Sequence, residues 1–251
     1  MVRFIIALFL TAFFSCHHHY VPHQYSNSNQ KIEKVTLSES NQIKNFIAPY
    51  KWRLDSIMNQ TIVEASDEFT KKPVESSLGN LMCDAMVWYA RERMQKKVDF
   101  SIVNYGGIRI QSIPKGPVSL GKIYELMPFE NMMTFAFLNG EQVNQLIHKM
   151  AEFNGWPVSA ELHYSIDERT QPIDILIQNH PLNRDSNYVV LLSDYLMDGG
   201  DKLDFLKEAK REVSAVLIRD AIIEYCKYKR ANNQSIIPII DGRVALKKNA
   251  K

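Results

Sequence analysis

The segment that most constrains the fold is residues 100–109, FSIVNYGGIR, where a short apolar run ends in two adjacent glycines. The apolar run predicts a buried strand, and Gly106 and Gly107 let the following backbone turn tightly or approach a ligand, because they carry no Cβ. Asn104 can donate to and accept from a heterocyclic base, and Arg109 offers a planar fork of donors to a carboxylate, phosphate or ring face. The segment can equally be a plain glycine-rich turn, so other motifs decide.

Helical and strand-like apolar patterns alternate along the chain. Helices are expected from near Pro49 and at residues 78–95, 119–126, 141–153 and 213–229. Strands are expected at residues 61–63, 100–103, 132–138, 163–166, 173–177, 188–192 and 242–246. Ser77 is expected to cap the second helix. This interleaving predicts a mixed α/β domain.

The N-terminus is typical of an export signal. An apolar run over residues 4–14 follows Arg3 and is shorter than a membrane span. Ser15-Cys16 after it resembles a bacterial lipoprotein cleavage site, although Phe13 stands where an aliphatic residue is usual. We therefore expect a signal peptide with a lipidated Cys16 over residues 1–16, with an ordinary cleaved signal peptide as the alternative. Either way the protein is expected to be exported, and with lipid to be membrane-anchored in the periplasm or at the cell surface.

The rest of the chain divides into two parts. Residues 17–34 are polar and lack an apolar period, which predicts a flexible tether, and residues 35–251 then form the folded domain. A net charge of +2 with scattered basic residues argues against binding to a nucleic-acid backbone. Cys83 and Cys226 lie in predicted helices and are expected to be buried hydrophobes, although spacing alone does not exclude a disulfide.

Four motifs carry a resemblance that covers the chain from about Glu75 to Leu246. They are residues 75–86 (ESSLGNLMCDAM), 104–109 (NYGGIR), 126–131 (LMPFEN) and 193–201 (SDYLMDGGD). In this order they resemble the C-terminal domain of the 5'-nucleotidases. The resemblance implies a single-domain, layered α/β/β/α sandwich with mixed sheets that grips the nucleoside part of a nucleotide. In that family, phosphate-ester cleavage belongs to a separate, more N-terminal metallophosphatase domain.

Two aromatic residues follow loop signals. Phe129 lies after a proline, and Tyr195 lies between a strand and a Gly-Gly turn. Such rings can close the ends of a core, or they can sandwich a planar base. The resemblance implies the second role, with Asp201 holding ribose hydroxyls. Because only the ring face is needed for stacking, Tyr195→Phe is expected to be nearly neutral.

The predicted substrate-binding set is therefore Asn104, Gly106, Gly107, Arg109, Phe129, Tyr195 and Asp201. One departure from the family concerns a further arginine before the 78–95 helix. Its matching position is Val74, and the nearby Lys71 and Lys72 supply charge without the planar fork. Phosphate contacts are therefore in doubt, whereas nucleoside recognition is not.

The sequence contains no visible catalytic centre. Hydrolysis by this family's route needs two metals held by several His and Asp side chains, but the histidines beyond the tether, at 148, 163 and 180, are dispersed. There is also no Asp-x-His pair, nucleophile elbow or P-loop. We expect no catalytic residue, metal or cofactor site in this chain, with divalent metals held by a separately encoded metallophosphatase partner. The alternative is a stand-alone nucleotide- or nucleoside-binding lipoprotein.

Overall fold

The computed structural model describes residues 40–247. The predicted signal peptide with Cys16 and the whole of the predicted tether, residues 17–34, lie outside the described residues. Two compact units divide the chain, residues 1–46 and residues 47–251. Helix α2 (Asn41–Met58) crosses this division and contains Pro49 in its interior. The prediction of a helix that starts near Pro49 was therefore wrong about the start. The helix begins at Asn41 and tolerates the loss of the backbone hydrogen bond that a proline cannot donate.

The remaining elements of the second unit alternate between helix and strand. The helices are α3 (Ser77–Glu92), α4 (Leu120–Leu126), α5 (Gly140–Glu152), α6 (Asp194–Met197) and α7 (Ile218–Ala231), with short 3₁₀ turns η1 (Tyr105–Gly107), η2 (Gly200–Lys202) and η3 (Asp204–Leu206). The strands are β1 (Thr61–Ala65), β2 (Phe69–Thr70), β3 (Phe100–Ser101), β4 (Ser112–Ile113), β5 (Gly116–Ser119), β6 (Met132–Asn139), β7 (Leu162–Ile166), β8 (Pro172–Ile177), β9 (His180–Pro181), β10 (Asn187–Ser193), β11 (Lys210–Leu217) and β12 (Val244–Leu246).

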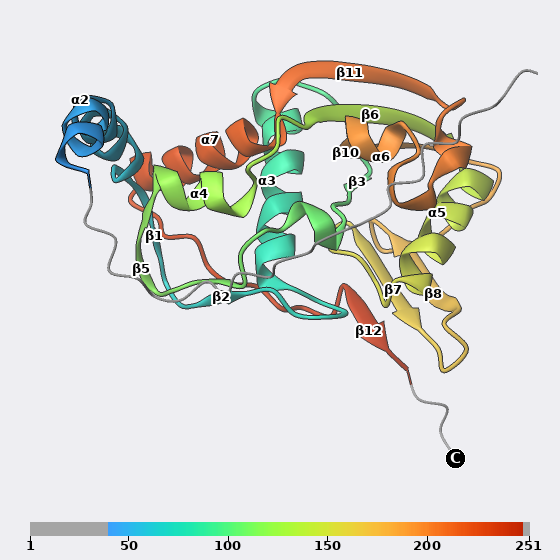
Figure 1. Cartoon of the computed structure of the whole chain (residues 1–251). Helices are drawn as coiled ribbons and strands as arrows, with labels where there is room; N and C mark the ends of the chain where they lie inside the picture. The colour runs from blue at the N-terminus through green and yellow to red at the C-terminus, as the bar shows by residue number, and fades with distance from the viewer. Residues whose placement is uncertain (1–39, 248–251) are drawn as a thin grey trace, which may run out of the picture. The chain divides into compact units, whose positions relative to one another are not determined.

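A four-stranded sheet with the order β11-β6-β10-β3 lies at the centre of this unit (Figure 1). Strands β11 and β10 run antiparallel to β6, whereas β3 is parallel to β10. Side chains alternate across the sheet, so Met133 and Phe135 enter one core cluster while Ala136 and Leu138 enter the other. The expected mixed α/β class with mixed sheets is confirmed.

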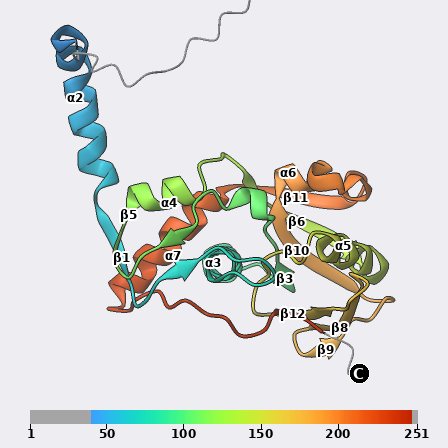
Figure 2. The ribbon, with the colours of Figure 1, turned by 60° about the horizontal axis from the view of Figure 1, so that its bottom comes forward.

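Helices and a second sheet cover the two faces of the central sheet. Helices α3 and α7 both contribute to the first core cluster and pack against each other, and α7 also packs against β1 (Figure 2). On the other face, α5 packs against β6, β10 and β8, and β8 belongs to a sheet with the order β12-β7-β8-β9. Two-stranded sheets β1-β5 and β2-β4 complete the fold. Within the described residues, no helix combines the length and apolarity needed to cross a bilayer.

Local signals explain where the helices begin. Ser76, one residue before the predicted Ser77, caps α3 by accepting a hydrogen bond from the backbone N–H of Gly79. The hydroxyl of Ser77 instead accepts from the backbone N–H of Thr70. Ser119 caps α4, and Asn139 forms a capping box with Gln142 at the start of α5.

The predicted helix at residues 213–229 was wrong in its first part. Residues 210–217 form strand β11, which pairs with β6 through register pairs such as Val213 with Thr134, and α7 begins only at Ile218. A short apolar run such as VSAVL fits a helix or a strand, and here backbone pairing with β6 makes it a strand.

A buried ion pair ties the last strand to α3. Arg243 has a side chain that is 1% exposed, and its two terminal nitrogens donate to the Asp84 carboxylate at 2.6 and 2.9 Å. It also donates to the carbonyl of Val158 at 3.0 Å. Strong bidentate pairing of this kind satisfies a guanidinium that has lost its water.

Candidate functional site

The predicted site residues gather at one edge of the central sheet. The carboxyl ends of β3, β10 and β11 lie at this edge together with the amino end of β6, because β6 runs the opposite way. Asn104 follows β3, Phe129 precedes β6, and Tyr195 follows β10. Chain segments far apart in the sequence therefore meet where the strands end.

A cavity of about 250 Å³ opens at this edge. It is lined by Met82, Val103, Asn104, Gly106, Gly107, Arg109, Met127, Phe129, Asn131, Ser193, Tyr195, Asp201 and Ile218. All seven residues predicted to bind substrate are among them. The sequence analysis did not assign the apolar part of the lining, which consists of Met82 from α3, Met127 from the loop before β6 and Ile218 from the start of α7.

The two glycines after β3 leave room for the side chain of Asn104. A Cβ added to Gly106 would lie 3.1 Å from the Asn104 amide nitrogen, and one on Gly107 would lie 3.2 Å from its amide oxygen. Neither glycine has a positive φ. The turn therefore uses glycine for space beside Asn104, rather than for left-handed backbone.

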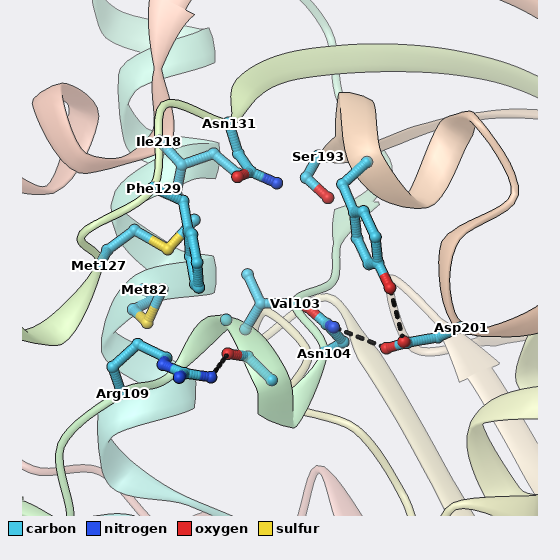
Figure 3. Close-up of a pocket in the computed structure, with 13 residues that line it drawn as sticks. Met82, Val103, Asn104, Arg109, Met127, Phe129, Asn131, Ser193, Asp201 and Ile218 are labelled. Atoms are coloured by element: carbon cyan, nitrogen blue, oxygen red, sulfur yellow. Dashed lines mark hydrogen bonds between the residues drawn. The ribbon is translucent and has the colours of Figure 1, made fainter. Parts of the chain in front are cut away.

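The carboxylate of Asp201 is the centre of a small polar network. Its Oδ2 accepts a hydrogen bond from Nδ2 of Asn104 at 2.6 Å, and its Oδ1 accepts one from the hydroxyl of Tyr195 at 3.0 Å (Figure 3). The bond to Asp201 is the main reason that the pKa of Tyr195 is raised above its ordinary value. The phenol therefore stays protonated and remains a donor at neutral pH.

Phe129 lies on the other side of the cavity, together with Arg109 (Figure 3). The Arg109 guanidinium carbon is 5.4 Å from the centre of the Phe129 ring, which is a cation–π distance. Phe129 and Tyr195 are 39% and 48% exposed, whereas other aromatic residues, such as Phe100 and Phe135, are buried in the core. Both rings are thus accessible to a planar ligand.

Arg219 supports the Phe129 loop from beneath, and the sequence reading missed it. It is 8% exposed, and Nη1 donates to the carbonyl oxygen of Phe129 at 3.2 Å, with a longer contact to that of Met127 at 3.5 Å. Its guanidinium lies 4.3 Å from the ring centre of Tyr124. No sequence signal marks a buried arginine, because a charged residue in the first turn of a helix normally faces solvent.

Lys71 and Val74 do not line this cavity. The ammonium of Lys71 donates to the carbonyl of Ile108 at 2.8 Å, within the turn that carries Arg109. Burial, and secondly the charge of Arg109, lower the pKa of Lys71. Val74 has a φ of 70°, an unusual backbone conformation for a β-branched residue. Lys71 thus supports the turn and leaves Arg109 as the cation that lines the cavity.

Among the described residues, no group of three or more His, Cys, Asp or Glu side chains is arranged to hold a metal ion. His180, which follows Asn179 in the sequence, pairs as strand β9 with β8 and its Nδ1 lies 2.8 Å from the carbonyl of Gln178.

Comparisons with known proteins identify the family and the fold. The family model for the 5'-nucleotidase C-terminal domain matches residues 58–208. The rat 5'-nucleotidase is 25% identical over 87% of this chain and 42% of its own length, and the Bacillus subtilis trifunctional nucleotide phosphoesterase protein YfkN is 25% identical over 88% of this chain and 16% of its own. The crystal structure of a Thermus thermophilus 5'-nucleotidase precursor superposes with a TM-score of 0.69 at 25% identity, covering 83% of this chain and 43% of that one.

The chain thus spans less than half the length of these relatives. The matched region contains the segments of β3, β6 and β10 that line the cavity. With the predicted resemblance confirmed by sequence and by fold, the chain belongs to the 5'-nucleotidase C-terminal domain family.

Proposed function

We propose that the cavity at the sheet edge binds the nucleoside part of a nucleotide. The observation that carries this proposal is the placement of two exposed rings, Phe129 on the loop before β6 and Tyr195 in α6, which line one cavity together with the carboxylate of Asp201. A purine or pyrimidine presents two flat faces and a ribose presents a pair of hydroxyls. Aromatic rings and a carboxylate acceptor are the groups that recognise these features.

Arg109 and Asn104 complete the proposed contacts. The Arg109 guanidinium lies beside Phe129 at the cavity wall, where it can reach phosphate or ribose oxygens. Asn104 keeps its amide oxygen for a base edge while its nitrogen donates to Asp201. The family name and the names of the relatives, which include nucleotidases and a nucleotide phosphoesterase, support a nucleotide as the ligand.

We further propose that this chain acts in nucleotide catabolism as the substrate-recognition component of a 5'-nucleotidase. A separately encoded metallophosphatase would supply the divalent metals and attack the phosphorus. Export and a lipid anchor on Cys16 would hold the chain at a membrane surface, where nucleotides outside the cytoplasm are available.

Two measurements test this proposal. Calorimetric titration of adenosine and AMP into the full-length chain, purified in detergent, is expected to show saturable binding at one site. Phosphate release from AMP with added Mn²⁺ is expected only after mixing with a metallophosphatase encoded beside this chain. If the chain binds nucleosides but mixing produces no phosphate release, the two-chain enzyme is ruled out and the stand-alone binding lipoprotein is favoured. Turnover by the isolated chain would contradict the division of labour.

The anchor has its own test. Lipidation through a thioether needs the thiol of Cys16, so Cys16→Ser is expected to move the protein from the membrane fraction to the soluble fraction, or to leave the precursor uncleaved. Fractionation and mass spectrometry of the N-terminus give the answer. Cys226→Ser is the matched control, because it removes a cysteine from α7 without touching the export signal. Unchanged membrane partition of the Cys16 variant would rule out the anchor.

A further inference from the structure

The hydroxyl of Tyr195 has a specific partner within the cavity. Tyr195 lies in α6, six residues before Asp201, and its hydroxyl donates to Oδ1 of Asp201 at 3.0 Å. The chain turns back between the two residues through Gly199, with a φ of 88°, and through Asp201 itself, with a φ of 51°. Left-handed conformation at a non-glycine residue is uncommon and marks a place where surrounding contacts hold the backbone.

The backbone of Gly200 supports the same ring. A Cβ built on Gly200 would lie 2.5 Å from Cε1 and Cζ of Tyr195 and 2.6 Å from the Tyr195 carbonyl oxygen. Glycine is therefore required here for close approach, and the hydroxyl end of the ring rests directly against the main chain that leads into Asp201. Ring, main chain and carboxylate form one packed unit.

The second oxygen of Asp201 is also held. Its Oδ2 accepts from Nδ2 of Asn104 at 2.6 Å, so each carboxylate oxygen receives one donor from the protein. A carboxylate oxygen can accept two hydrogen bonds, which leaves one further acceptor position on each. Two fixed oxygens with one free position each match the two adjacent hydroxyls of a ribose.

From this geometry we infer that Tyr195 is a positioning residue: its hydroxyl orients the Asp201 carboxylate and thereby determines the preference for ribose over deoxyribose. This inference rests on the proposed function and adds sugar specificity to it. The hydroxyl holds the carboxylate plane toward the sugar while the ring of the same residue stacks on the base. The inference departs from the sequence-based expectation that Tyr195→Phe is nearly neutral, since phenylalanine would keep the ring and release one oxygen of Asp201.

The test compares the affinities of nucleosides that differ only in their sugar hydroxyls, in the wild type and in one variant. Calorimetric titrations of adenosine, 2'-deoxyadenosine and 3'-deoxyadenosine are made with the full-length wild-type chain and with Tyr195→Phe. We expect the variant to bind adenosine roughly five- to tenfold more weakly, as for loss of one typical hydrogen bond, and to bind both deoxy ligands within about twofold of wild type. The ratio of ribose to deoxyribose affinity should fall accordingly.

A double-mutant cycle shows whether the hydroxyl acts through Asp201. Asp201→Asn alone should lower the same ratio, and adding Tyr195→Phe should produce little further loss, because the two residues serve one contact. Tyr188→Phe is the matched control: its hydroxyl bonds the backbone of Asn183, away from the cavity, and its loss should leave all three affinities unchanged. Melting temperatures confirm that each variant is folded.

The outcomes separate the two proposals. Equal weakening of all three ligands by Tyr195→Phe, or additive losses in the double mutant, would overturn the positioning role while leaving nucleoside binding in place. A folded wild-type chain that binds none of the nucleosides, alone or with its partner, would overturn both.

Discussion

The side chain of Arg219 donates to the carbonyl oxygen of Phe129, 90 residues earlier in the chain, at 3.2 Å. The guanidinium is buried beneath the loop and lies over the ring of Tyr124. It therefore fixes the main chain that carries one of the two exposed rings, without itself lining the cavity.

Replacing this arginine should weaken both stability and binding. Arg219→Met keeps much of the apolar stem but leaves the carbonyl of Phe129 without its donor, which is expected to cost about 1–3 kcal/mol of unfolding free energy. Adenosine affinity should fall roughly three- to tenfold as the loop loosens. Urea unfolding and calorimetry measure the two effects. Arg184→Met, which removes only an exposed pair with Glu141, should change neither, and equal effects in both variants would count against the assignment.

The aromatic pair Phe129 and Tyr195 gives the most direct test of the base site. Truncating either ring to alanine removes one stacking surface, and base–aromatic stacking contributes about 1–3 kcal/mol per base. Adenosine and AMP affinity should therefore fall about tenfold to hundredfold in calorimetric titrations.

Phe137→Ala is the control for these truncations. Phe137 is an exposed aromatic residue of β6, 37% accessible, that does not line the cavity. Its loss should leave nucleoside affinity within about twofold. If all three truncations weaken binding alike, the rings act through general stability rather than as stacking faces.

The pair between Arg243 and Asp84 should dominate the stability of the C-terminal strand. Arg243→Met leaves the Asp84 carboxylate, which is 25% exposed, without its partner. Breaking a buried pair in this way typically costs about 3–5 kcal/mol of unfolding free energy. Urea unfolding should show this loss, and adding Asp84→Asn should recover part of it. Lys247→Met, which breaks an exposed pair with Asp174, should cost less than about 1 kcal/mol. Comparable losses at both sites would argue against a buried pair.

Both helical cysteines should be unreactive in the folded protein. Cys83 and Cys226 are free and buried, and burial raises the pKa of Cys226 to about 12 and raises that of Cys83 as well. Thiolates are the reactive form, so at pH 8 a thiol reagent should label neither residue in a Cys16→Ser chain, and both after denaturation. One equivalent of rapid labelling in native buffer would contradict the buried placement.

The motifs predicted the site better than the contacts within it. Asn104 could be assigned to a turn after a strand because glycine and polar residues interrupt the apolar run there. Tyr195 was expected in a loop, but it lies in α6, a short helix capped by Ser193. The hydrogen bonds to Asp201 could not be predicted, because they depend on left-handed backbone at Gly199 and Asp201 that places a side chain beside a residue six positions earlier.

The fold shows a similar division between local and long-range information. Periodicity located α3, α5 and most strands to within a few residues, since their apolar faces are long enough to show a period. Residues 213–217 were misassigned because five apolar and small residues fit a helix as well as a strand, and pairing with β6 decides the matter. Arg219 was missed for a different reason, because a charged residue on a helix normally faces solvent.

Residues at or next to one end of every strand in the central sheet line the cavity. A bound nucleoside would therefore contact all four strand ends and hold them together. The shortest strand of this sheet is β3, an edge strand of two residues, Phe100 and Ser101, which pairs with β10. Asn104, which follows it, is tied across the cavity to Asp201. Amide hydrogens around β3 should therefore exchange more slowly with solvent when ligand is present, and this protection would report occupancy from inside the core rather than from the pocket.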